Sequence, residues 1–231
     1  MNKDKKLHYL KAMEIDVWIS KDSTVSVQDI SMSKKKSTSK LIPELNWEEL
    51  ATCVANCKLC DLHQYRTQAV FGVGNNQADL LIVGEAPGAN EDKQGEPFVG
   101  RAGRLLNAIL QSIDLKREDI YIANILKSRP PNNRDPSPEE VAACTPYLKR
   151  QIALIKPKLI LALGRIAAHH LLATNVAMAQ LRGKEFTYGE LQTPLLVTYH
   201  PAYLLRAPRE KRKAWEDMLL VAKRLEQLQT C

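Results

Sequence analysis

The stretch LLIVGEAPGANEDKQGEPFVGRAGRLL, residues 80–106, decides the fold that we expect of this chain. Its first four residues form a short, continuous apolar run, which is typical of a strand buried on both faces. A segment rich in glycine, proline and carboxylates follows, and the helix-like RAGRLL comes after it. Open α/β sheets build their ligand sites in this way, where a buried strand ends and a turn leads into a helix.

The rest of the chain repeats this alternation of strand and helix. Strand candidates are residues 79–86, 120–127, 158–164 and 194–200, and helix candidates are about 101–112, 138–155, 165–172 and 210–228. The helix at 138 has a clear start signal, because Ser137 precedes Pro138. Near-continuous apolar strands separated by helices predict a parallel sheet that is covered on both faces.

The composition limits the class of protein. A chain of 231 residues is long enough for one sizeable α/β domain with extensions. The excess of 33 Lys and Arg over 26 Asp and Glu favours an anionic partner such as nucleic acid. No apolar run approaches the roughly 20 residues of a membrane span, and the N-terminus lacks the apolar core of a signal peptide. We therefore expect a soluble, cytoplasmic monomer without a membrane partner.

The chain divides into an N-terminal extension and one domain. Residues 1–46 form the expected extension and linker, which is rich in Ser, Lys and Thr up to Lys40, and residues 47–231 form the domain. Residues 1–40 offer one place where a protein partner could bind.

Three polar clusters follow the predicted strands. They are Glu85 to Asp92, the segment from Asn124 to Arg134, and His200 to Tyr203. Each has an ordinary structural explanation, namely a solvated turn, a strand-end amide and a structural histidine. Because loops at the carboxyl ends of parallel strands share one crevice, the three clusters together predict a functional site.

Four segments in this order carry a family resemblance. GEAPGANED with PFVGRAG, NILKSRPPNNRDP, LALGRIA and YHPAYLLR resemble the uracil-DNA glycosylase superfamily, and family 4 most closely, over roughly residues 47–225. The resemblance implies a three-layer α/β/α sandwich around a four-stranded parallel sheet. It also implies a DNA repair enzyme that hydrolyses the N-glycosidic bond of uracil in single- or double-stranded DNA and leaves an abasic site.

The resemblance assigns a role to three pocket residues. Phe98 is expected to stack on the uracil after the base has left the helix. Asn124 accepts from uracil N3–H and donates to O4, a pattern that cytosine reverses. His200 hydrogen-bonds O2 and stabilises the negative charge of the departing base.

The carboxylate that activates water has two candidates. Ala86 occupies the place where family 1 enzymes carry an aspartate for this task, so Glu85 and Glu91 both remain open. Gly84, Ala86 and Asn133 are expected to line the substrate pocket.

Further residues are expected to contact DNA. Leu204 or Leu205 is the candidate wedge for the gap that the extruded base leaves. Phosphate contacts are expected from Arg101, Arg104, Lys127, Arg129, Arg134 and Arg206.

The cysteines indicate a metal centre. Cys57 and Cys60 form a C-x2-C pair, and the family 4 resemblance implies a [4Fe–4S] cluster completed by Cys144 and one further cysteine. Ser128 stands at that fourth position, and a serine oxygen is a poor ligand for such iron. A cluster of some kind with a structural role is expected, since the uracil chemistry has no redox step.

Several ligand sets remain open. Ser128 or an exogenous ligand could take the fourth position, Cys53 could replace it, or the cluster could be labile or absent. A zinc site from Cys53, Cys57 and Cys60 with Cys144 or His63 is a less favoured alternative.

Two other functions compete with the glycosylase. One is a non-catalytic nucleic-acid-binding module of the same fold, linked to replication or repair proteins. The other is a redox-sensing iron–sulfur protein, which the replacement at Ser128 disfavours. The joint presence of Glu85, Phe98, Asn124 and His200 favours the enzyme.

Overall fold

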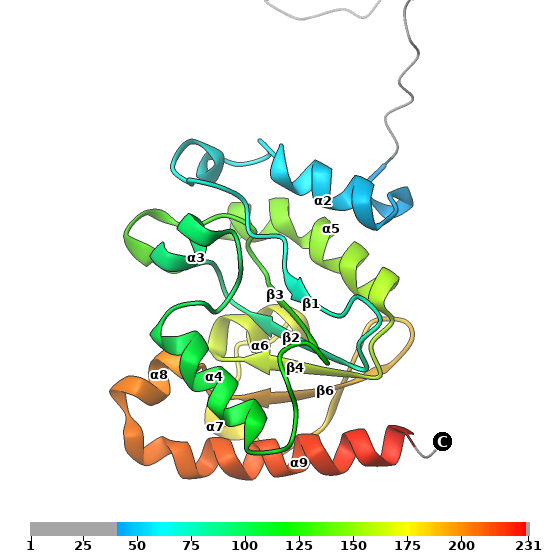
Figure 1. Cartoon of the computed structure of the whole chain (residues 1–231), viewed down its shortest axis with the longest axis vertical. Coiled ribbons are helices and arrows are strands. Elements are labelled where there is room, and N and C mark those ends of the chain that lie inside the picture. Colours follow the sequence, from blue (N-terminus) through cyan, green and yellow to red (C-terminus); the bar gives the residue numbers. More distant parts are fainter. Residues whose placement is uncertain (1–40, 230–231) are drawn as a thin grey trace, which may run out of the picture. The chain divides into compact units, whose positions relative to one another are not determined.

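The computed structural model describes residues 41–229, and its centre is a mixed β-sheet (Figure 1). The sheet has six strands in the order β1-β3-β2-β4-β6-β5. The four central strands run parallel to one another; they are β2 (Leu80–Gly84), β3 (Tyr121–Asn124), β4 (Leu159–Leu163) and β6 (Thr193–Thr198). The predicted α/β fold with a parallel core is confirmed. The hypotheses about residues 1–40 lie outside the described residues.

The sheet is wider than predicted, because an antiparallel strand is added at each edge. β1 (Val73–Gly74) pairs with β3, and β5 (Phe186–Tyr188) pairs with β6. Strands of two and three residues are too short to produce a readable apolar alternation. For that reason the sequence predicts four strands where the structure has six.

Alternate residues of each central strand face opposite sides of the sheet. Leu81 and Val83 of β2 pack with one apolar cluster, whereas Leu80 and Ile82 pack with another. The first cluster includes residues of α5 (Pro138–Ile155) and α6 (Arg165–Leu172), and the second includes residues of α4 (Arg101–Gln111) and α9 (Lys211–Gln229). Figure 1 shows α5 on one side of the sheet and α4 and α9 on the other, which gives three layers.

The long helices agree closely with the predicted ranges, and Ser137 caps α5 through a reciprocal hydrogen-bond pair with Glu140. The remaining helices are short. The α-helices among them are α2 (Trp47–Ala55), α3 (Ala89–Gln94), α7 (Met178–Leu181) and α8 (Pro201–Arg206). The 3-10 helices are η1 (Ile42–Glu44), η2 (Asp61–Gln64), η3 (Pro131–Asn133) and η4 (Pro208–Glu210). Within residues 41–229, no helix is both long and apolar enough to span a bilayer.

The strand register brings the carboxyl ends of the parallel strands to one edge. Gly84 at the end of β2 pairs with Asn124 at the end of β3, and Leu163 of β4 pairs with Thr198 of β6. The segments that leave these four ends therefore begin side by side, as the polar clusters in the sequence predict.

Candidate active site

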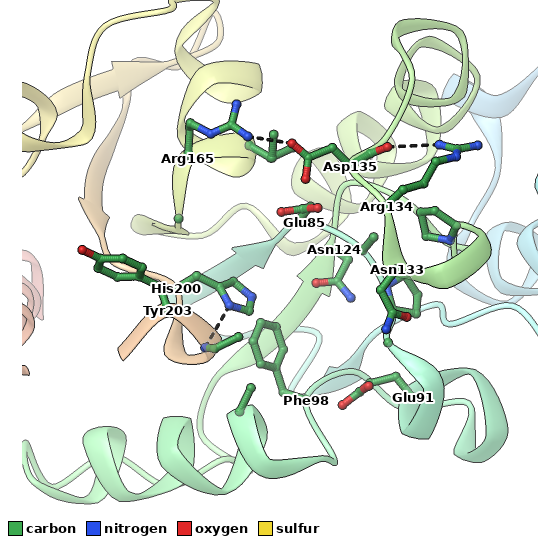
Figure 2. A pocket seen from close by; sticks show the side chains of 18 of the residues that line it. Glu85, Glu91, Phe98, Asn124, Asn133, Arg134, Asp135, Arg165, His200 and Tyr203 are labelled. Atoms are coloured by element: carbon green, nitrogen blue, oxygen red, sulfur yellow. Dashed lines mark hydrogen bonds and ion pairs between the residues drawn. The ribbon is translucent and has the colours of Figure 1, made fainter. Parts of the chain in front are cut away.

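A cavity of about 770 Å³ lies at this edge of the sheet. Each of the four central strands contributes to its lining through its last residue or the loop that follows. Glu85 follows β2, Asn124 ends β3, Arg165 begins the helix after β4, and His200 follows β6 (Figure 2). The structure therefore brings together three polar clusters that lie far apart in the sequence, at residues 85, 124 and 200.

Asn124 presents an unpaired acceptor to this cavity. Its residue is only 2% exposed, and its Oδ1 has no hydrogen-bond partner among the described residues. A buried carbonyl without a partner is costly, and it points to a ligand that supplies a donor. Gly84 leaves room for the Asn124 amide and the Phe98 ring, because a Cβ on Gly84 would lie 2.4 Å from Asn124 Oδ1 and 2.7 Å from Phe98 Cζ.

Phe98 is held in a left-handed backbone conformation, with φ of 56°. The Glu91 carboxylate accepts hydrogen bonds from the backbone N–H groups of Val99 and Gly100, both at 2.9 Å. On the other side, the Arg117 guanidinium donates to the carbonyls of Pro97 and Phe98. These contacts fix the aromatic ring as one wall of the cavity.

His200 is a neutral imidazole with a defined tautomer. Its Nδ1 accepts a hydrogen bond from the Ala202 N–H at 3.1 Å, so the ring proton resides on Nε2. Burial, with a smaller contribution from the Arg206 charge, lowers the pKa of His200 to about 4. Its ring centroid lies 5.5 Å from that of Phe98. The site therefore offers a neutral N–H donor next to an aromatic wall.

The two candidate carboxylates have different surroundings. Glu91 is engaged by the backbone of the Phe98 loop. Glu85 lines the cavity, and its carboxylate makes no hydrogen bond within the part of the chain that the structure describes. Burial raises the pKa of Glu85, and the Asp135 charge adds to this rise while Arg165 opposes it. Glu85 is therefore the carboxylate whose oxygens are free of hydrogen bonds in this turn.

Three further predicted residues take distinct places. Ala86 and Asn133 line the cavity as expected, and Asn133 accepts a hydrogen bond from Arg129 Nε at 2.7 Å. Asp92 belongs to the same acidic turn but is buried, where its carboxylate accepts from the backbone and hydroxyl of Thr67. Asp92 therefore has a structural role.

Lys127 differs from the prediction of a phosphate contact, because its side chain is buried. Its Nζ donates to the Asn124 carbonyl at 2.9 Å and to Gln151 Oε1 at 2.6 Å. Burial lowers the pKa of Lys127 to about 7. Lys127 thus supports the backbone of Asn124 from inside the domain, and it is not available to DNA.

The candidate DNA contacts divide by exposure. Arg101 and Arg206 are exposed and have no ion pair within residues 41–229, whereas Arg134 is paired with Glu140 at 2.5 Å. Leu204 is only 1% exposed, which does not suit a wedge that enters DNA, and Leu205 is partly buried.

The cysteine region offers three thiols and an engaged serine. Cys57 and Cys60 lie between α2 and η2, and Cys144 is buried on α5. The Ser128 hydroxyl accepts a hydrogen bond from Arg66 Nη1 at 2.8 Å, and Arg66 Nη2 donates to the Cys57 carbonyl at 3.0 Å. Over the described residues, no group of three His, Cys, Asp or Glu side chains is arranged to hold a metal ion.

The alternative ligands also have other contacts. Cys53 Sγ lies 3.8 Å from the Tyr147 hydroxyl, and His63 Nδ1 donates to the Cys60 carbonyl at 2.8 Å.

Several site residues were not predicted. Asp135 and Arg165 form an ion pair of 2.7 Å at the cavity wall (Figure 2). Asp135 lies in the segment NRDP and Arg165 in LALGRIA, so the sequence motifs could have identified both as site residues. Gly164, with φ of +85°, allows close approach of His200, because a Cβ there would lie 2.7 Å from that of His200. Tyr199 also lines the cavity, as does Tyr203, which belongs to the third polar cluster of the sequence.

Comparison with known proteins identifies relatives of this chain. Residues 71–219 match the family model described as the uracil DNA glycosylase superfamily. The type-4 uracil-DNA glycosylase of Archaeoglobus fulgidus is 44% identical over 177 residues, which cover 74% of this chain and 88% of that protein. The type-4 uracil-DNA glycosylase of Thermotoga maritima is 46% identical over 156 residues, which cover 66% and 80% respectively.

The neutral state of His200 can be tested directly. We expect its imidazole NMR signals to titrate near pH 4, and to return to the ordinary value near 6.5 when the protein is unfolded. Because the folded pKa lies below the unfolded one, folding stability should decrease as the pH falls from about 6.5 through about 4. A folded-state transition near 6.5 would contradict the buried, neutral imidazole.

Proposed function

Because the chain belongs to the uracil-DNA glycosylase superfamily, we propose that it excises uracil from DNA in base excision repair. The reaction breaks the bond between sugar C1′ and uracil N1, and water supplies the new C1′–O bond. The products are free uracil and an abasic site.

The observation that carries this proposal is the unpaired Oδ1 of Asn124 in the cavity wall. Uracil N3–H is the donor that this oxygen lacks, and the Nδ2 of the same amide can donate to uracil O4. Cytosine presents an acceptor at N3 and a donor at N4, so it would leave the amide mismatched. Asn124 accordingly selects uracil, and Phe98 stacks on the extruded base.

His200 assists the departure of the base. Its Nε2–H donates to uracil O2, where negative charge develops as the C1′–N1 bond breaks. The Nδ1 contact with Ala202 N–H supports this role, because it keeps the proton on the nitrogen that faces the substrate. Because the imidazole is neutral, it stabilises the uracil anion by a hydrogen bond and does not transfer its proton to the base.

Glu85 activates the water. General bases need a free lone pair and a pKa that is not too low, and Glu85 meets both requirements. Glu91 holds the Phe98 loop instead, since one of its oxygens already accepts two backbone N–H groups. Exposed Arg101 and Arg206 contact DNA phosphates.

The function is tested with a labelled oligonucleotide that contains one uracil, followed by alkaline cleavage of abasic sites. We expect strand breaks with the wild-type protein and a loss of about 100-fold in the single-turnover rate for Asn124→Ala, because the hydrogen bonds to the base are removed. Normal excision by a folded Asn124→Ala protein would contradict the pocket, and no cleavage of any uracil substrate by the wild type would contradict the function.

The two carboxylates are separated by matched amide substitutions. Glu85→Gln should lower the single-turnover rate by about 100-fold to 10,000-fold, since an amide cannot take a proton from water. Glu91→Gln should retain most activity, because its amide oxygen can still accept from Val99 and Gly100. The reverse pattern would assign the base to Glu91.

The family context suggests an iron–sulfur cluster, but the residues of this chain do not fit a site with four thiolates. Of the four positions that the family resemblance implies, three carry thiols, and Ser128 at the fourth is hydrogen-bonded to the Arg66 cation. The further thiol of Cys53 lies 3.8 Å from the Tyr147 hydroxyl. The proposed reaction therefore uses no step at a metal. We propose that Arg66 ties the Cys57 turn to Ser128, and so to the segment after β3, in this protein.

Ser128→Cys tests this assignment. The variant places a thiol at the fourth ligand position of the family, so we expect more bound iron and sulfide and a stronger broad visible absorbance than in the wild type. Uracil excision should change little, because the chemistry has no redox step. Equal iron content in the two proteins would contradict the inference that Ser128 weakens iron binding at this position.

A further inference from the structure

Tyr203 lies at the mouth of the cavity, and the proposed chemistry does not use it. The residue is 38% exposed and lines the cavity next to His200. In Figure 2 its ring lies on the far side of His200 from Asn124. Its hydroxyl has no hydrogen-bond partner within the described part of the chain.

The ring is supported from the protein side by a buried network. Tyr203 contacts the Tyr199 ring, with centroids 5.1 Å apart, and the Arg182 guanidinium lies 4.5 Å from the centroid of Tyr199. Asp217 fixes Arg182 through both carboxylate oxygens, at 2.7 and 2.9 Å, and also accepts from the Thr198 hydroxyl at 2.6 Å. This network positions the exposed ring before any ligand binds.

A cation lies on the same side of α8. Arg206 is three residues after Tyr203, so the two side chains project from one side of the helix. Arg206 also lines the cavity and is exposed. In single-stranded DNA, an aromatic ring can stack on a base, and a free guanidinium at this spacing can contact the adjacent backbone phosphate.

We propose that Tyr203 stacks on the base next to the extruded uridine in the same strand, while Arg206 contacts the backbone phosphate. This inference rests on the proposed function. Extrusion of uridine leaves its neighbour with one face unstacked, and an aromatic ring can cover that face whatever the base. Leu204 is buried and Leu205 is partly buried, whereas Tyr203 is exposed, so the aromatic ring takes the place of the leucine wedge expected from the sequence.

The test combines protein variants with modified single-stranded oligonucleotides. The base on the 5′ or the 3′ side of uracil is either kept or replaced by a base-free tetrahydrofuran. Wild-type kcat/KM should fall roughly 5-fold to 100-fold when the stacked neighbour is removed, and Tyr203→Ala should cause a similar fall on the intact oligonucleotide. Tyr203→Ala should then lose little more on the base-free substrate, because both changes remove one contact. Tyr203→Phe should behave as the wild type.

The matched control is Trp215→Ala, which removes an aromatic side chain that is 41% exposed and does not line the cavity. For Trp215→Ala, removal of the neighbouring base should lower kcat/KM by the same factor as for the wild type. The proposal would be overturned if Tyr203→Ala and removal of either neighbouring base lowered kcat/KM independently. It would also be overturned if the effect of Tyr203→Ala depended only on the base opposite uracil in a duplex. Failure of the proposed function would be distinguishable, because the wild type would then excise uracil from none of the substrates.

Discussion

The site depends on the absence of a side chain at Gly84. Its register partner is Asn124, and the ring of Phe98 reaches the same point from the loop after α3. A single methyl group there would overlap both the amide oxygen and the ring. The backbone of β2 therefore forms the floor of the cavity between the Asn124 amide and the Phe98 ring. Every other feature of the pocket is arranged around this close approach.

Hydrogen bonds to the backbone distinguish residues of the same type. Asp92 holds Thr67 and Glu91 holds the Phe98 loop. Glu85 and Glu91 both line the cavity, but among the described residues only the Glu85 carboxylate of these three has no hydrogen bond. Likewise, the Nδ1 of His200 is occupied at the start of α8, so only the other nitrogen is available. The protein uses most of its polar groups to fix geometry, and the few that remain unengaged can act on a substrate.

The parallel core and the convergence of Glu85, Asn124 and His200 could be predicted from the sequence, because buried strands and strand-end loops have strong local patterns. The edge strands were missed since their few residues carry no period. Glu85 and Glu91 differ in hydrogen bonding because Glu91 accepts from backbone N–H groups eight and nine residues away, which no motif spacing reveals. The burial of Leu204 likewise follows from tertiary packing of α8.

The unpaired oxygen of Asn124 also affects the stability of the empty protein. An unsatisfied buried carbonyl destabilises a fold by about 1–3 kcal/mol, a sizeable part of the small net stability of a domain. The empty protein therefore carries a local cost at Asn124 that an apolar residue would not have. A ligand that donates a hydrogen bond to this oxygen would remove the cost, so binding and thermal stability are coupled at this one atom.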